Sequence, residues 1–195
     1  MKFTKIILAT LLFSGAIFAN EANDTMALKK EGVKYIKMLG MALKSELKKH
    51  LQADKTALDA LHFCVDKAAK ITAEVNSKLP EGVLVRRTAL KFRNPANKPD
   101  EIDTKVMNEM LEAKKAGKFK AKPVVVDAGD KIRVYKPLII DDVCLKCHGD
   151  PAKMDKKVQE IVSKKYPEDK ATGFKLYDLR GVIVAELPKK ENSKK

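Results

Sequence analysis

The sequence has few aromatic residues and no tryptophan, contains no internal repeat, and has only a short apolar stretch. That stretch, from Ile6 to Phe18, is about a dozen residues long, whereas a membrane-spanning helix needs about 20. A permanent membrane span is therefore not expected. The basic residues are not interleaved with aromatic side chains in one patch, as nucleic-acid binding would favour, so that function class is excluded.

The N-terminus has the order of features found in a secretory signal peptide. Lys2 and Lys5 precede the apolar run, and small residues follow it up to Ala19. We predict a signal peptide over residues 1–19, and no cysteine lies near its end to carry a lipid anchor. The mature chain is then expected in an oxidising compartment, the bacterial periplasm.

The rest of the chain has the size of one domain and a strongly positive charge. We expect one domain over residues 20–188 and a disordered lysine-rich tail over 189–195. Residues 1–19 contain two lysines and no acid, so their removal lowers the net charge from +14 to +12. Lysines alternate with acids along the expected helices, which indicates a solvated surface. The same charge would also attract an acidic redox partner or an anionic membrane surface.

The spacing of apolar residues is helical in the first third and mixed in the remainder. It predicts amphipathic helices over 23–53 and 55–78, packed as an antiparallel hairpin. Later elements are predicted as a β-rich run over 83–90, a helix over 100–116 capped by Asp100, a hairpin of 124–127 with 131–140, a helix over 154–165, and a second hairpin of 173–178 with 182–187. About five antiparallel strands with helices on one side make an α+β fold.

The strongest motif is Cys144-Leu145-Lys146-Cys147-His148. Two thiols at this spacing can add to the two vinyl groups of haem, and the adjacent histidine then reaches the iron. We therefore expect one c-type haem, covalently attached through Cys144 and Cys147, with His148 as the proximal axial ligand. A thioredoxin-like redox pair would need a βαβ setting. A zinc site would need a second ligand pair, which only the remaining cysteine and two histidines could supply, and a disulfide across four residues is strained.

A sixth ligand on the other face of the iron sets its potential and its access to small molecules. The candidates are Cys64, His50, His62 and the methionines. Cys64 is the odd cysteine and lies on an Ala-rich stripe of the second expected helix, where a flat macrocycle could approach. The same position equally suits a small buried hydrophobe. His62 is expected to be exposed or at the core edge, and His50 is expected to face solvent.

Arg86, Arg87 and Arg93 form the chain's one arginine cluster. Because guanidinium pairs bidentately with carboxylate, we predict that one or more of them hold haem propionates. Solvent-facing strand ends are the alternative.

Four blocks occur in order along the chain: Val85 to Asn97, Cys144 to Gly149, Tyr166 to Phe174, and Asp178 to Gly181. Together they resemble the PAS-like c-type haem domain family, which includes the Tll-type haem domain, and the resemblance covers nearly the whole mature chain. It implies a PAS-like antiparallel sheet preceded by long helices, with one haem held by His148 and an opposing Cys64. Such a His/Cys pair would give low-spin iron with a low potential. The family's Gly-Asp-Leu-Arg-Gly appears here with Tyr177 in place of the first glycine.

Two functions follow from these expectations. The first is a sensor of redox state or of a small ligand such as NO or CO, in which Cys64 is displaced and a signalling partner reads the change. The alternative is a periplasmic electron carrier with both axial positions filled, docking through its lysine-rich surface. No motif places a distal acid–base pair, so no enzymatic activity is expected. The long helices could also pair with a second copy of the chain.

Overall fold

The computed structural model describes residues 14–54 and 56–189, with side chains from Asp24 onward. Residues 1–13 of the expected signal peptide and residues 190–195 of the expected tail lie outside this part. Among the described helices, none combines the length and the apolar character needed to cross a membrane.

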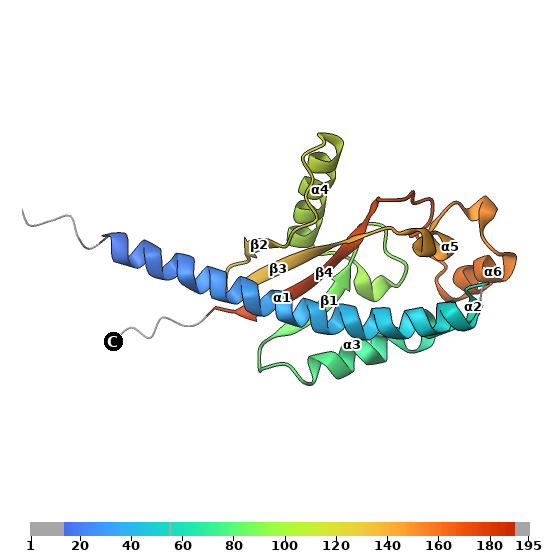
Figure 1. Cartoon of the computed structure of the whole chain (residues 1–195), viewed down its shortest axis with the longest axis horizontal. Helices are drawn as coiled ribbons and strands as arrows, with labels where there is room; N and C mark the ends of the chain where they lie inside the picture. Colours follow the sequence, from blue (N-terminus) through green and yellow to red (C-terminus); the bar gives the residue numbers. More distant parts are fainter. Residues whose placement is uncertain (1–13, 55, 190–195) are drawn as a thin grey trace, which may run out of the picture.

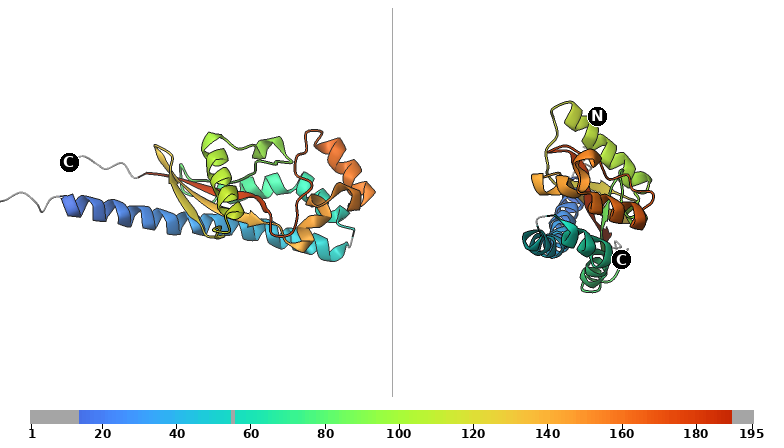
Figure 2. Two further views of the ribbon diagram at one scale, coloured as in Figure 1. Left: turned by 90° about the horizontal axis from the view of Figure 1, so that it is seen from above. Right: turned by 90° about the vertical axis from the view of Figure 1, so that its right-hand side faces the viewer.

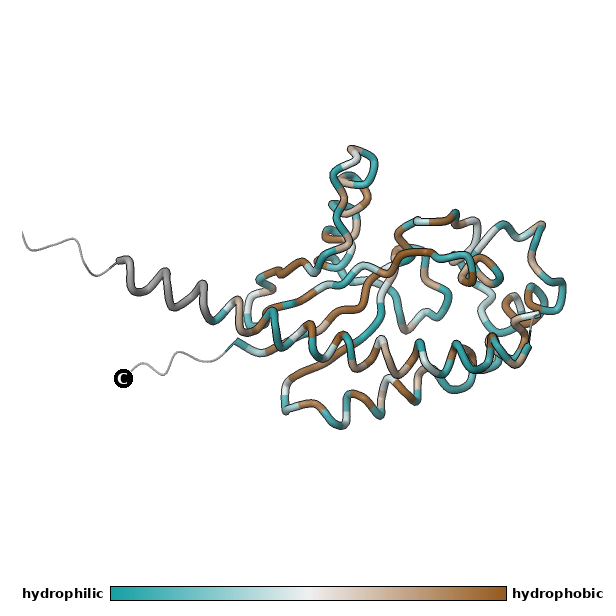
Figure 3. The backbone as a smooth tube through the Cα atoms, in the orientation of Figure 1, coloured by the Kyte–Doolittle hydropathy of each residue, from teal (hydrophilic) through white to brown (hydrophobic). Residues whose placement is uncertain are grey.

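A four-stranded antiparallel sheet lies at the centre of the molecule (Figure 1). Its order is β1 (Leu84–Thr88), β4 (Leu179–Pro188), β3 (Lys131–Ile139), β2 (Val124–Asp127). The inner strand β4 pairs with β1 through Arg87 and Ile183, and with β3 through Tyr135 and Val184. Brown stretches along the central strands in Figure 3 mark their apolar character. The α+β class is confirmed.

Helices cover both faces of this sheet (Figure 2). Helices α1 (Ser14–Ala53), α2 (Leu58–Asp66) and α3 (Ala68–Asn76) share one core with Ile183, Ala185 and Leu187 of β4. Helix α4 (Glu101–Lys115) packs on the other face against Val182 and Val184. Successive residues of a strand point to opposite faces, so the run from Val182 to Ala185 in β4 is continuously apolar because both faces of the strand are covered. The expectation of helices on one side only is wrong.

The N-terminal helical hairpin is confirmed, but its second arm is divided. Asp54 accepts hydrogen bonds from the backbone N–H groups of Thr56 (2.8 Å), Leu58 (2.9 Å) and Asp59 (3.2 Å), which delays the start of α2 to Leu58. Ala57 takes a left-handed conformation at this turn, with φ of 67°. A break at Lys67 then separates α2 from α3. The turn therefore fixes where α2 begins.

The other expected elements are largely confirmed. Asp100 caps α4 by accepting from the Asp103 N–H (2.8 Å), and β2 and β3 form the first hairpin. The remaining helical elements are η1 (Pro95–Asn97), η2 (Asp142–Cys144), α5 (Leu145–His148), η3 (Pro151–Lys153) and α6 (Lys156–Lys165).

The expected second hairpin is wrong, so the described sheet has four strands and not about five. Residues 173–178 form no strand, because their backbone bonds to the segment after Cys147: Gly173 N–H donates to Gly149 (2.7 Å) and Phe174 N–H to His148 (3.0 Å). The expected turn at 179–181 instead begins β4. Gly181 is required there, since a Cβ would lie 2.5 Å from the Thr88 carbonyl oxygen.

Candidate functional site

Cys147 and His148 lie on the single helical turn of α5, and Cys144 ends η2 directly before it, at the end of the molecule where α2 and α6 also meet (Figure 1). The turn is entered through Asp141, whose N–H donates to the Cys144 sulfur (3.4 Å). It closes with Gly149 N–H donating to the Leu145 carbonyl (2.9 Å). A Cβ at Gly149 would lie 2.6 Å from that oxygen, so only glycine permits so tight an exit.

The His148 ring is fixed in one protonation state. Its Nδ1 lies 2.7 Å from the Ala171 carbonyl oxygen. A carbonyl only accepts, so Nδ1 carries the proton and Nε2 keeps its lone pair in the neutral ring. Burial and the nearby charges of Arg180 and Arg93 lower the pKa of His148 well below its usual range. The Phe174 ring meets the imidazole edge-on, with centroids 6.3 Å apart. His148 is therefore a neutral imidazole with Nε2 as its available donor atom.

An ion pair holds the segment that carries the Ala171 carbonyl. Arg93 donates to both Asp169 oxygens, at 3.2 and 3.1 Å, and to the Cys147 carbonyl at 2.6 Å. Asp169 also accepts from the Ala171 N–H at 2.9 Å. Arg93 thus joins α5 to residues 169–171, and its charge is neutralised by Asp169. It is a positioning residue for His148.

The two motif cysteines pack in different apolar clusters. Cys147 contacts the cluster of Leu61, Val158 and Val162 between α2 and α6, whereas Cys144 packs beside Ile140, Ala171 and Phe174. Burial raises the pKa of Cys147 to about 11, although Arg93 opposes the shift. Both residues are free thiols and only partly accessible. At neutral pH the Cys147 side chain is accordingly a protonated thiol.

Cys64 on α2 is accessible to solvent and is not the small buried hydrophobe that the sequence left open. Burial nevertheless raises the pKa of its thiol, while the charges of Arg87 and Arg93 act in the opposite direction. Cys64 in turn raises the pKa of Cys147, so the two sulfurs belong to one electrostatic neighbourhood. The Cys64 thiol is thus reached by solvent from one side, while the protein surrounds it on others.

The other candidates for a sixth ligand lie in different surroundings. His50 places Nδ1 2.6 Å from Asp59 Oδ2 and stacks on Phe63 at 5.0 Å, so the expectation that it faces solvent is wrong. His62 is exposed, as expected. Of the methionines in α1, Met38 packs against the core and Met41 is 69% exposed.

Strand alternation separates the predicted arginines. Arg86 faces α4 and donates to Asp103 of that helix (2.8 Å) and to Glu186 of β4 (2.8 Å). The structure therefore does not bring Arg86 to the motif. Arg87, the next residue, belongs to the neighbourhood of Cys64, and burial lowers its pKa. Among the described residues, Arg87 has no carboxylate partner.

Arg180 belongs to this neighbourhood although no sequence pattern singled it out. Its Nη1 donates to the Lys91 carbonyl (2.9 Å), and its guanidinium lies over the Phe174 ring at 5.4 Å. Burial and the charges of Arg93 and Arg87 lower the pKa of Arg180 to about 10, so it remains a cation at neutral pH. The block Asp178 to Gly181 contains it, but that block is typical of a turn.

The described part of the chain does not provide the surroundings that a thioredoxin-like redox pair or a zinc site would need. All strand pairs there are antiparallel, so there is no βαβ unit of the thioredoxin kind. No group of three or more His, Cys, Asp and Glu side chains gathers there closely enough to hold a metal ion.

Comparisons with known proteins agree with this architecture. The Tll0287-like family model matches residues 17–188. Among solved structures, the crystal structure of the cyanobacterial haem protein Tll0287 is similar, with a TM-score of 0.62 and 23% identity over 80% of this chain and 92% of that one. At this identity the likeness concerns the fold. No curated protein matches the chain.

Proposed function

Because this chain belongs to the Tll0287-like family, we propose that it binds one c-type haem, attached covalently through Cys144 and Cys147, with His148 as an axial ligand. The observation that carries this proposal is the state of His148: a neutral ring whose Nδ1–H is held by Ala171 and whose Nε2 is available. Histidine binds metals in this state, with the second nitrogen fixed by a carbonyl or carboxylate. Haem would supply a one-electron couple and an iron that accepts small ligands.

The other side chains of the neighbourhood fit the same group. The Cys64 sulfur is accessible to solvent, although burial raises the pKa of its thiol. It also lies near enough to Cys147 to raise the pKa of that residue. We assign Cys64 as the second axial ligand. Arg87 is a desolvated cation without a carboxylate partner among the described residues, so a propionate would supply the missing anion. Arg86 and Arg93 already pair with Asp103 and Asp169, and we do not assign them to a propionate.

We further propose that the protein is exported to the periplasm and acts there as a sensor of redox state or of a small ligand, without enzymatic activity. The charge around the motif supports sensing over docking. Residues 141–170, the segment that contains α5 and α6, have seven lysines and seven acids and so carry no net charge in spite of the total of +14. An electron carrier that docks through lysines close to its cofactor would be expected to concentrate them there. The alternative, a periplasmic carrier, rests on the overall positive charge.

The first test is an absorption spectrum of protein made in cells that export it and attach haem. Wild type should show a low-spin haem that stays bound after denaturation, and Cys64→Ala should be high-spin. His62→Ala, two residues away on the exposed side of α2, is the matched control and should resemble wild type. A wild type without covalent haem would refute the proposed function. A Cys64→Ala spectrum equal to that of wild type would remove Cys64 as ligand.

A second experiment separates sensor from carrier. The reduced protein is exposed to CO and to NO, and its electron exchange with an acidic redox protein is measured at several salt concentrations. A sensor should bind the gas and change its spectrum. A carrier should bind none and should exchange electrons at a rate that falls steeply with salt.

A further inference from the structure

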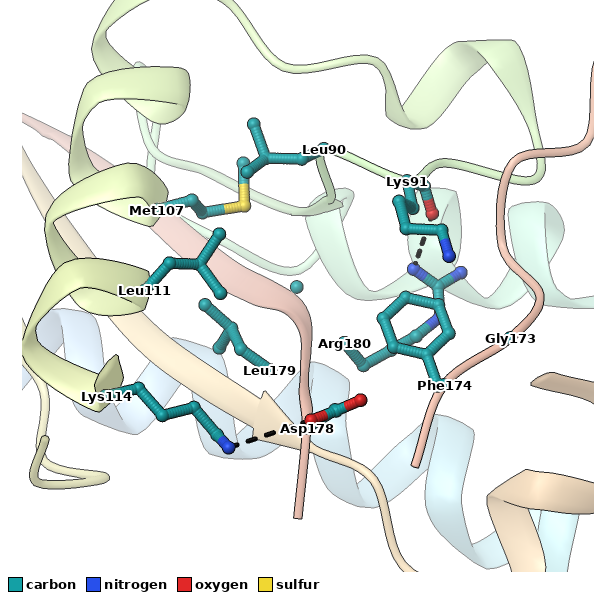
Figure 4. Close-up of a pocket in the computed structure, with 11 residues that line it drawn as sticks. Leu90, Lys91, Met107, Leu111, Lys114, Gly173, Phe174, Asp178, Leu179 and Arg180 are labelled. Atoms are coloured by element: carbon teal, nitrogen blue, oxygen red, sulfur yellow. Dashed lines mark hydrogen bonds and ion pairs between the residues drawn. The ribbon is translucent and has the colours of Figure 1, made fainter. Parts of the chain in front are cut away.

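A cavity of about 260 Å³ lies between α4 and the beginning of β4 (Figure 4). It is partly open to solvent. One wall is apolar and is formed by Leu90, Met107, Leu111 and Leu179. The opposite wall contains Phe174 and Arg180. The cavity is therefore a cleft at the surface, with the buried Met107 among the residues that line it.

The charges of the cavity are unevenly distributed. Lys91 and Arg180 gather at the Phe174 end, with Lys91 Nζ 4.6 Å and Arg180 Cζ 5.4 Å from the centre of that ring. The remaining lysine, Lys114, is already paired with Asp178 at 3.6 Å. Arg180 has no carboxylate partner among the described residues, and only its Nη1 makes a hydrogen bond there. The cavity thus has an apolar end and an end with two cations that form no ion pair with a described acid, although Lys91 already donates to the Thr172 carbonyl.

We propose that this cavity binds a small monocarboxylate with an unbranched apolar chain of about six carbons. Ligand pockets are characteristically apolar with a few convergent polar groups, and this one is at the small end of their size range. The chain would cover the apolar wall on α4, and the carboxylate would accept from Arg180 and Lys91. Guanidinium suits a planar carboxylate, and partial burial strengthens the pairing.

The cavity adjoins the proposed haem site: Phe174 lines the cavity and meets His148 edge-on, and Arg180, which also lines it, lies close enough for its charge to lower the pKa of His148. None of the residues that line the cavity is assigned to haem in the proposed function, so the carboxylate does not need haem in order to bind. A chain that fails to attach haem can still bind the carboxylate, and the failure of one proposal is distinguishable from the failure of the other.

Hexanoate is the probe, and the Met107 methyl group is the reporter, observed by NMR in methyl-labelled protein. We expect the Met107 signal to shift saturably with hexanoate. Hexanol, which lacks the charge, and acetate, which lacks the chain, should bind at least about tenfold more weakly, a difference of about 1.4 kcal/mol. Inorganic phosphate tests whether any anion suffices, and it should leave the signal unmoved.

Variants assign the two ends of the site. Arg180→Gln should weaken hexanoate binding at least about tenfold and bring it close to that of hexanol. Lys118→Gln, which removes an exposed lysine outside the cavity, should bind as wild type does. Leu111→Trp should fill the cavity and abolish the shift. Leu84→Trp, on β1, introduces the same residue elsewhere and should not.

The proposal is overturned if about 10 mM hexanoate leaves the Met107 signal of the wild type unmoved. It is also overturned if Arg180→Gln, shown by circular dichroism to be folded, binds hexanoate as tightly as wild type. Equal binding by Leu111→Trp would place the ligand elsewhere on the protein.

Discussion

The ion pair between Arg93 and Asp169 gives a direct test of how His148 is held. Both side chains are nearly buried, at 10% and 9% exposure, and Asp169 accepts from Arg93 twice and from Ala171 N–H once. In Asp169→Asn, the remaining oxygen can still accept from Ala171. Its amide group then faces a guanidinium that has only donors. The hydrogen bond from Arg93 Nη2 to Oδ2, worth about 1.5–3 kcal/mol, is lost, and the bond from Arg93 Nε to Oδ1 no longer reaches a charged acceptor.

We therefore expect Asp169→Asn to lower the free energy of unfolding by about 3–5 kcal/mol, the range for removing one partner of a buried ion pair. Urea unfolding followed by circular dichroism measures this difference. Asp155→Asn is the control, since Asp155 caps α6 at its exposed start and asparagine caps equally well. Its effect should stay below about 0.5 kcal/mol. A loss below about 1 kcal/mol in Asp169→Asn would show that the pair does not hold the segment and would refute the reasoning.

Three further predictions concern the turns and the buried charges. Asp103 is fully buried between Arg86 and Arg133. Asp103→Ala should lower the free energy of unfolding by about 3–5 kcal/mol, measured by urea unfolding. Gly149→Ala should open the turn of α5 and cost about 1–3 kcal/mol in the same assay, because its Cβ would overlap a carbonyl oxygen. Hydrogen bonds from Thr56 lower the pKa of Asp54 to about 2. Carboxyl ¹³C NMR should give that midpoint, and the stabilisation by Asp54, complete above about pH 4, should be lost as the pH falls towards 2.

Local signals were sufficient to predict the elements that are stabilised locally. The prediction that Asp100 caps α4 is confirmed, because its side chain accepts from the N–H three residues later, an interaction that depends little on the surrounding packing. The hairpin of β2 and β3 was correct for a similar reason, since its turn residues lie next to each other in sequence. The predicted strand over 173–178 is wrong because the backbone of this segment bonds to His148 and Gly149, about 25 residues away in the chain. No local sequence pattern indicates such distant partners.

The site divides in the same way. The spacing of Cys144, Cys147 and His148 marked the motif, and the structure places them at the end of η2 and on the turn of α5 that follows it directly. Strand alternation is a local signal that is sufficient to separate Arg86 from Arg87, because neighbours in a strand point to opposite faces. No such signal selects Arg180. Its approach to Phe174 depends on where β4 begins, and the sequence pattern placed a turn there.

The two proposed axial ligands are held very unequally, and this bears on what the protein can sense. His148 is fixed through its Nδ1 by Ala171, through its own carbonyl by the Phe174 N–H, and indirectly by the pair of Arg93 with Asp169. Cys64 lies on a nine-residue helix that begins after a left-handed residue, Ala57, and ends at a break. Breaking a bond to iron on the His148 side would therefore require several hydrogen bonds to rearrange, whereas a rotation of the Cys64 side chain involves none of them. If one ligand is exchanged for a gas molecule, the structure favours the departure of Cys64, and the movement would pass into α2 and the helical layer that covers the sheet.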